Sequence, residues 1–262
     1  MATMWNFRRQ ILQHLHPDPV ADEKLAARRA ASEVEFKLTQ ECLMSNPKSY
    51  PVWFHRMWVL EWGECSWQWK TDLKLTAKML ALDDRNFHCW TYRRFVVRQA
   101  SVPLTDELAF TMGKINANFS NYSAWHYRSK LLPQLYKPAT DTDQDRFECV
   151  LREELALLRN AFFTAPEDQS AWFYHRWLLA QLEERLGTAT TAMLETLQEE
   201  LNMLNELLEL EPDCKWPLAT VSFIAKKLSL PADTRLAQLK MLQSIDPMRS
   251  QHYKHQLTLA SG

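Results

Sequence analysis

The chain has 262 residues, of which 46% are hydrophobic and 24% charged, and its 31 basic and 32 acidic side chains leave a net charge of −1. This length allows a sizeable hydrophobic core, and the balanced charge argues against nucleic acid as the main partner, because phosphate binding needs an excess of Lys and Arg. Glycine is scarce, at 4 residues, whereas tryptophan reaches 11. Few glycines mean few of the tight turns that join β-hairpins, and the dominant residues favour helices. We therefore expect an all-α protein.

The amino-terminal segment, MATMWNFRRQILQHL, lacks the unbroken apolar stretch of a signal peptide. No run elsewhere approaches the roughly 20 apolar residues that cross a bilayer. The cysteines contain no C-x-x-C pair, which predicts buried or partly buried free thiols rather than a disulfide framework or a zinc finger; they are Cys42, Cys65, Cys89, Cys149 and Cys214. We expect a cytoplasmic protein that does not insert into a membrane.

A tryptophan followed one helical turn later by a basic residue recurs along the chain. In chain order the copies are WNFRR at Trp5, WFHRMW at Trp53, WTYRRF at Trp90, WHYRSK at Trp125, WFYHRW at Trp172 and a degenerate KWPLATV at Trp216. Their spacing of 35 to 48 residues fits a unit of two helices and two loops. The repeat predicts that residues 1–262 form one domain, a superhelical array of antiparallel helical hairpins.

Each hairpin is expected to contain an amphipathic first helix, a polar lead and a second helix that carries the tryptophan. The leads are rich in Asn, Asp, Ser and Pro, which cap and start helices; they are SNPKSYPVW, LDDRNFHCW, NFSNYSAW, APEDQSAW and LEPDCKW. In the first helices, acidic pairs such as Glu153–Glu154 and Glu199–Glu200, together with Glu183–Glu184 in a second helix, predict solvated faces.

The tryptophan and the residue three positions later lie on one side of the second helix. The residues predicted to anchor the repeats are therefore Trp53 with Arg56, Trp90 with Arg93, Trp125 with Arg128, and Trp172 with Arg176, although His175 holds the third position in that last copy. We expect the tryptophans to fill the seam between hairpins and the arginines to stack on aromatic rings or bond to loop carbonyls. Taken alone, this pattern predicts a scaffold with an extended concave surface and no activity.

The repeat resembles that of protein prenyltransferase α subunits, with its P-x-x-Y-x-x-W-x-x-R core. The matching segments are residues 46–58, 83–96, 118–135 and 160–179. The last two, together with SIDPMR at 244–249, resemble the Rab geranylgeranyltransferase α subunit more than the α subunit shared by the farnesyl and type I enzymes. The resemblance covers the chain apart from residues 136–149 and 186–192.

The resemblance implies that this chain wraps around a β subunit that carries the zinc ion and most of the isoprenoid pocket. It implies no metal or cofactor bound by this chain itself. Geranylgeranyl diphosphate would bind at the subunit interface, and its lipid would pass to carboxy-terminal cysteines of Rab GTPases. The Rab escort protein that presents the Rab substrate is expected on the later hairpins, roughly residues 150–250.

The same resemblance assigns four site residues in two adjacent leads. Lys48 corresponds to the lysine that stabilises the diphosphate, and Tyr50, Asn86 and His88 correspond to substrate-binding positions. Phe87 departs from the tyrosine of the farnesyl-type subunit. Each residue also has a purely structural interpretation: a solvated lysine, a helix-start staple, an N-cap and an interface histidine.

Other motifs suggest no separate chemistry. His14 with His16, and His252 with His255, have spacings that could pair on a metal, but no acidic or thiol ligand accompanies them, so we expect surface histidines. The nucleotide-binding and nucleophile motifs G-x-x-x-x-G-K-[ST], G-x-G-x-x-G and G-x-S-x-G do not occur. The chain therefore has no self-sufficient active site.

Only four residues precede Trp5, so the first repeat is expected to be incomplete, and neither an immunoglobulin-like insert nor a leucine-rich tail fits the sequence. Two alternatives stay open. One is the α subunit shared by the farnesyl and type I enzymes, against which Phe87 and the NFSNYSAWHYRS block count. The other is a non-catalytic scaffold of the tetratricopeptide kind, against which the irregular spacing counts.

Overall fold

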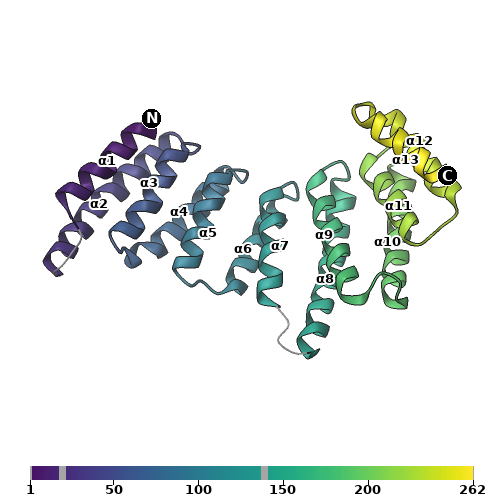
Figure 1. The fold of residues 1–262 in the computed structure, drawn as a ribbon, viewed down its shortest axis with the longest axis horizontal. Coiled ribbons are helices and arrows are strands. Elements are labelled where there is room, and N and C mark those ends of the chain that lie inside the picture. The colour runs from purple at the N-terminus through teal and green to yellow at the C-terminus, as the bar shows by residue number, and fades with distance from the viewer. Residues whose placement is uncertain (1, 18–21, 137–140, 262) are drawn as a thin grey trace. The chain divides into compact units, whose positions relative to one another are not determined.

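The structure is a computed structural model that describes residues 2–17, 22–136 and 141–261, and all regular secondary structure in these ranges is helical (Figure 1). This confirms the all-α prediction. The chain divides into two compact units, Met1–Glu107 and Leu108–Gly262, so the prediction of a single domain over residues 1–262 stays a prediction. Within the described ranges, no helix is long and apolar enough to cross a membrane.

The first unit begins with a single helix that carries Trp5 and continues with hairpins. Its elements are α1 Ala2–Leu15, α2 Asp22–Ser45, α3 Tyr50–Trp62, the 3-10 helix η1 Ser66–Gln68, α4 Trp69–Leu82, α5 Phe87–Gln99 and the start of α6 Leu104–Ala117. Helices α2 and α3 form one antiparallel pair, α4 and α5 the next, and the second helices α1, α3 and α5 pack in series (Figure 1).

The second unit contains the rest of α6 and the remaining hairpins. Its elements are α7 Tyr122–Leu135, α8 Asp141–Thr164, α9 Gln169–Leu186, α10 Thr191–Leu210, α11 Lys215–Lys227, α12 Ala232–Ile245, the 3-10 helix η2 Pro247–Arg249 and α13 Ser250–Ser261. Helices α8 and α9, α10 and α11, and α12 and α13 pack as pairs (Figure 1). A small core of Leu218, Leu239, Leu242 and Tyr253 joins α11 to the last pair.

The leads fold into the same turn in three hairpins. The side-chain oxygen of Asn46 accepts a hydrogen bond from the backbone N–H of Lys48, Asp83 accepts from Arg85, and Asn118 accepts from Ser120, at 3.0 to 3.2 Å. This is the local bonding for which Asn and Asp are favoured in turns. Asn86, Asn121 and Asp168 then cap α5, α7 and α9 through their side chains, as the sequence predicts.

All five cysteines are free. Cys65, Cys89 and Cys214 are buried and Cys42 is half-buried, but Cys149 is exposed on α8, so the expectation of burial is wrong for that residue. Burial raises the pKa of the Cys214 thiol to about 12 and also raises that of Cys65. Both thiols are therefore protonated and unreactive at neutral pH.

Candidate functional site

Four tryptophans make the same hydrogen bond. The indole N–H of Trp53 donates to the carbonyl of Pro47, Trp90 to Asp84, Trp125 to Phe119 and Trp172 to Pro166, each at 2.8 Å and each six residues back. Every indole therefore holds its own lead against the start of the second helix. Trp216 departs from this rule, since its indole donates to Glu167 of the preceding hairpin at 3.2 Å, in keeping with its degenerate motif.

The same indole rings fill the seam between neighbouring hairpins, where the sequence pattern expects them. The ring of Trp53 lies 5.2 Å from that of Tyr92 on the next second helix, and Trp125 lies 4.9 Å from Tyr174. Trp90 and Trp125 are among the largest fully buried side chains of the described residues. An indole suits this position because it has the area to bridge two hairpins and a single donor to satisfy.

Lys48 lies where two adjacent leads meet in the first unit. The carbonyl of Pro47, immediately before it, accepts two hydrogen bonds of 2.8 Å, from the indole of Trp53 and from the side-chain amide of Asn86. The Lys48 ammonium lies 3.2 Å from a carboxylate oxygen of Asp83, while the Lys48 side chain is 73% exposed. The backbone of this lysine is thus fixed, and its charge is held at the surface by an acidic residue of the next lead.

The aromatic residues of the two leads lie beside this lysine in the sequence and close to each other in space. The rings of Tyr50 and His88 are 6.0 Å apart, and Phe87 packs against His88 at 3.9 Å. Tyr50 and Phe87 are exposed, whereas His88 is half-buried and its burial lowers its pKa. His88 is therefore neutral at physiological pH and can serve as a hydrogen-bonding group.

The four predicted site residues thus converge, and the structure gives one of them a second role. Asn86 caps α5 by accepting from Cys89 N–H at 3.1 Å, and it also donates to Pro47. Lys48, Tyr50 and His88 lie on the same two leads, and no side-chain hydrogen bond like those of Asn86 is seen for them among the described residues. A flexible cation, a phenol and a neutral imidazole are together able to bind an anionic ligand with an apolar tail.

The arginines of the repeated motif also form buried ion pairs. Arg56 donates to Asp72, Arg93 donates to Glu107 through two nitrogens, and Arg128 donates to Glu154 at 2.7 and 2.5 Å. In each case the arginine leaves a second helix and the carboxylate belongs to the first helix of the next hairpin. We did not expect these ion pairs. The stacking that we expected is also present for Arg56, whose guanidinium lies 5.0 Å from the centre of the Phe36 ring.

Each of these arginines also binds the first helix of its own hairpin. Nη1 of Arg56 donates to Phe36 O and Thr39 Oγ1, that of Arg93 to Leu73 O and Thr76 Oγ1, and that of Arg128 to Leu108 O and Thr111 Oγ1. Each guanidinium therefore bonds both the first helix of its own hairpin and the acidic residue of the next hairpin. A lysine ammonium could not make this set of bonds, because it lacks the planar fork of donors.

Arg176 does not belong to this series of ion pairs, but it stacks on an aromatic ring of the next hairpin, as we expected of the arginines. His175 takes the position instead and bonds Glu200 at 2.7 Å. Arg176 is exposed, with its guanidinium 3.5 Å from the centre of the Phe223 ring.

The acidic partners were missed, because Glu154 and Glu200 were assigned to solvated faces but are buried. A signal for them existed in the sequence. Glu35, Asp72 and Glu154 each precede a bonded His or Tyr by 20 residues, namely His55, Tyr92 and Tyr174. A carboxylate that recurs at a constant distance before the W-x-[YH] motif is tied to that motif, whereas surface acids have no reason to keep the spacing.

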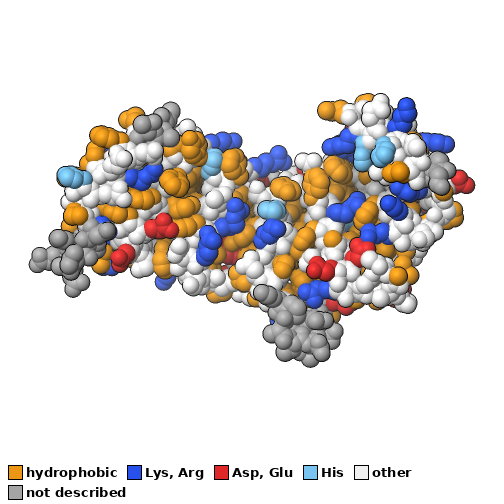
Figure 2. All heavy atoms as spheres, viewed as in Figure 1, with side chains coloured by type: hydrophobic (Ala, Val, Ile, Leu, Met, Phe, Trp, Pro, Cys, Tyr) orange, Lys and Arg blue, Asp and Glu red, His pale blue; other side chains and the backbone are white. Residues whose placement is uncertain are grey.

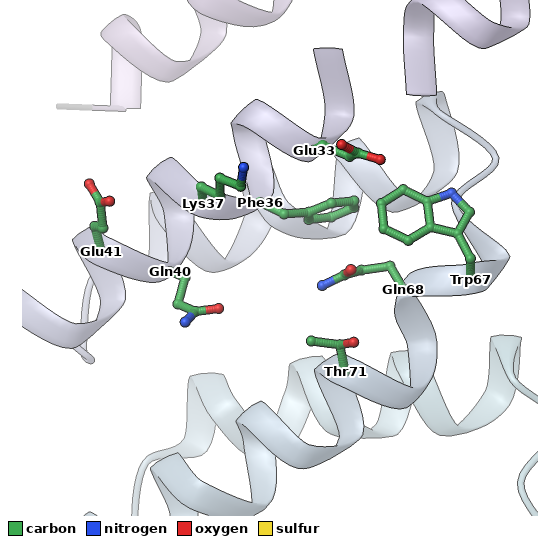
Figure 3. A pocket seen from close by; sticks show the side chains of 8 residues that line it. All are labelled: Glu33, Phe36, Lys37, Gln40, Glu41, Trp67, Gln68 and Thr71. Atoms are coloured by element: carbon green, nitrogen blue, oxygen red, sulfur yellow. The ribbon is translucent and has the colours of Figure 1, made fainter. Parts of the chain in front are cut away.

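Other pockets and histidines suggest no second site of this kind. The pocket of Figure 3, about 380 Å³, lies between α2 and the η1–α4 segment and is lined by Phe36 and Trp67 with Lys37, Gln68 and other polar side chains, and it contains none of the predicted site residues. His14 and His255 are exposed. Among the residues that the structure describes, no three His, Cys, Asp or Glu side chains gather as metal ligands would.

Comparisons with known proteins agree with the repeat. Residues 32–63, 69–100, 104–135 and 151–182 match the protein prenyltransferase alpha subunit repeat, which corresponds to the pairs α2–α3, α4–α5, α6–α7 and α8–α9. The chain is 52% identical over 183 residues to the geranylgeranyl transferase type-2 subunit alpha of Rattus norvegicus, a match that covers 70% of this chain and 31% of the rat protein. The chain thus spans about a third of the length of the mammalian relatives that it matches.

A second relative matches along almost the whole chain. The geranylgeranyl transferase type-2 subunit alpha of Dictyostelium discoideum is 38% identical over 255 residues, which cover 96% of this chain and 77% of the relative. Among solved structures, the Candida albicans protein geranylgeranyltransferase-I complexed with GGPP has the same fold, with a TM-score of 0.72, 23% identity, and coverage of 99% of this chain and 79% of that one. Because the identity and the coverage of the Dictyostelium protein are both high, the chain belongs to the family of geranylgeranyl transferase type-2 α subunits.

Proposed function

We propose that this chain is the α subunit of a heterodimeric Rab geranylgeranyltransferase. The observation that carries the proposal is the 38% identity to a type-2 α subunit over 96% of the chain. In this role the helical array is the scaffold for a zinc-bearing β subunit. The lipid passes from geranylgeranyl diphosphate to cysteines at the carboxy terminus of Rab GTPases that an escort protein presents.

The contribution of this chain to the chemistry would come from the two leads of the first unit. The departing diphosphate gains negative charge as the bond to the lipid breaks, and a cation placed beside it lowers the barrier. Lys48 is suited to this role because its backbone is fixed by Pro47 while its ammonium lies exposed beside Asp83. Tyr50 and His88 would flank the ligand, and Asn86 would keep the two leads together.

Exposed aromatic side chains on the second helices support an interface with the β subunit. These aromatic residues stand three positions before the motif tryptophan or one position after it. The exposed ones are Tyr50, Phe54 and Phe87 in the first unit, and Tyr122 and Phe173 in the second. In the second unit these rings are in contact, Tyr122 with Phe173 at 6.2 Å and Phe173 with Trp216 at 5.6 Å. Rows of exposed aromatic residues are typical of protein interfaces, and we expect poor solubility without the partner.

The test is co-expression with a type-2 β subunit, size-exclusion chromatography and a transfer assay on a Rab–escort complex. A heterodimer of one copy each that transfers geranylgeranyl supports the proposal. A heterodimer that instead prefers a farnesyl donor and a short peptide substrate supports the shared α subunit of the farnesyl and type I enzymes. A soluble monomer that ignores the β subunit contradicts both and leaves a scaffold role.

A further inference from the structure

The turn that opens a lead carries a negative charge in only one of its three equivalent copies. The residues that open these turns are Asn46, Asp83 and Asn118. In each copy the side chain accepts a hydrogen bond from the backbone N–H two residues on, and the carbonyl accepts one from the N–H three residues on, at 3.0 to 3.3 Å. Because neutral Asn46 and Asn118 make the same turn, the turn itself does not require the charge of Asp83.

The position of Asp83 also disfavours a negative charge. Asp83 is the C-cap of α4, and the carboxy end of a helix carries the negative end of the helix dipole, where cations are favoured. An asparagine would therefore suit this turn better on local grounds alone. A residue that goes against a local preference in this way indicates a role outside the turn.

The group that explains the charge is the ammonium of Lys48. It lies 3.2 Å from Oδ2 of Asp83, and the two side chains are 73% and 28% exposed. Oδ1 of Asp83 is held by the backbone N–H of Arg85, and the bond from Asn86 to Pro47 ties the two leads together. The carboxylate is thus the fixed member of the pair, and the lysine, on its flexible stem, is the movable one.

Basic side chains are visible in this part of the molecule. Figure 2 shows Lys and Arg side chains, in blue, along the upper edge of the part formed by α3–α5, where Figure 1 places both leads. A diphosphate that approaches the leads therefore meets cations, and Asp83 is an acid placed among them. The carboxylate works against the charge that would attract this ligand, so its effect on the ligand can be measured.

We propose that Asp83 is a positioning residue that acts through Lys48. It holds the ammonium where the two leads meet, and it competes for that ammonium with the diphosphate that leaves the prenyl donor. This inference rests on the proposed function, in which Lys48 meets the departing diphosphate. Two anions that share one cation weaken each other's binding. Asp83 therefore lowers the affinity for the released diphosphate and draws Lys48 back as that product departs.

The test uses Asp83→Asn in the heterodimer with a type-2 β subunit, because asparagine makes the same turn at positions 46 and 118. Inorganic diphosphate displaces radiolabelled geranylgeranyl diphosphate at equilibrium, at low ionic strength, where charges are least screened. We expect inorganic diphosphate to bind about fivefold more tightly to the variant, the effect of removing a competing, partly exposed ion pair. A purely structural role has the opposite sign, because a loosened lead would misplace Lys48 and weaken binding.

The matched control is Glu33→Gln, which removes one negative charge from an exposed position of α2 and should change the dissociation constant of inorganic diphosphate by less than about twofold. Lys48→Ala separates action through the lysine from direct repulsion of the ligand. In that background Asp83→Asn should have an effect of less than about twofold, because the cation for which the two anions compete is gone.

The inference is overturned by unchanged or weaker binding of inorganic diphosphate to Asp83→Asn, or by an equal effect of Glu33→Gln. It is also overturned if Asp83→Asn tightens binding equally with and without Lys48, which would show direct repulsion. A parent heterodimer that does not transfer geranylgeranyl, or a Lys48→Ala variant with unaltered kcat, contradicts the role of Lys48 in the proposed function, and the inference falls with it. A parent that transfers the lipid and needs Lys48 but shows no effect of Asp83→Asn overturns this inference alone.

Discussion

Glu154 on α8 offers the sharpest test of the buried charge pairs, because its neighbour Glu153 is exposed and provides a matched control. The Glu154 carboxylate accepts two bonds from Arg128, at 2.7 and 2.5 Å, and one from Tyr174 at 2.8 Å. Burial and the Glu154 carboxylate raise the pKa of Tyr174 well above its usual value despite the opposing charge of Arg128, so the Tyr174 hydroxyl stays a donor. Glu154→Leu leaves a buried guanidinium and a buried hydroxyl without their acceptor.

Removal of one partner from a buried ion pair costs about 3–5 kcal/mol. Arg128 keeps its bonds to Leu108 O and Thr111 Oγ1, which places the expected loss near the lower end of that range. Urea denaturation followed by circular dichroism and by tryptophan fluorescence measures the change in the free energy of unfolding, provided that the two probes coincide. Glu153→Leu should change it by at most about 0.5 kcal/mol.

The reasoning is refuted if Glu154→Leu and Glu153→Leu lower the free energy of unfolding by the same amount. A second variant separates the charge from the packing. Arg128→Met added to Glu154→Leu removes both charges, and because an apolar replacement of a buried pair is often neutral or better, it should recover much of the loss. A double variant no more stable than Glu154→Leu alone means that the cost came from repacking and not from an unpaired guanidinium.

Three further outcomes are expected. Lys48→Ala should lower kcat of the heterodimer on the order of 10²-fold with subunit assembly unchanged, whereas Lys78→Ala, an exposed lysine of α4, should leave it unaltered; equal kcat for the two variants would remove Lys48 from the chemistry. Burial raises the pKa of Glu35, but hydrogen bonds from His55 and Arg8 outweigh this and lower it from 4.5 to about 2, so Glu35 stabilises the fold fully above pH ~4.5 and progressively less down to pH ~2. Acid titrations of Glu35→Gln and the parent should therefore converge toward pH 2, and a constant gap would contradict the pairing. Trp90→Phe should cost about 1–3 kcal/mol, because Asp84 O loses a 2.8 Å hydrogen bond and the smaller ring leaves a void; thermal denaturation measures it, and Trp58→Phe, on a half-buried tryptophan outside the series, should cost less.

The sequence was sufficient for the helical hairpins and their phase, because tryptophan, the N-cap residues and the turn-forming Asn and Asp each act within one lead. The resemblance to prenyltransferase α subunits assigned Lys48, Tyr50, Asn86 and His88 to two adjacent leads, and these leads lie side by side in the structure. The acidic partners were not found, because burial of Glu154 depends on the next hairpin, and an acidic pair in a helix looks the same whether one member faces solvent or not. The bond between His175 and Glu200 was missed for a related reason, since only the packing of α10 brings Glu200 to His175.

The shared carboxylates have a consequence for how the chain unfolds. Asp72 accepts from Arg56 of the preceding hairpin and from Tyr92 of its own, so neither hairpin can satisfy its buried polar atoms without the other. If α4 melts, Arg56 loses its carboxylate partner while Phe36 and Thr39 of α2 still hold its guanidinium, and the penalty falls on α3, which is still folded. Loss of structure at one hairpin therefore destabilises its neighbour, and melting should spread between adjacent hairpins instead of stopping at the loops that join them. For the same reason, a truncation that ends after α3 would leave an unpaired guanidinium at the new end of the array.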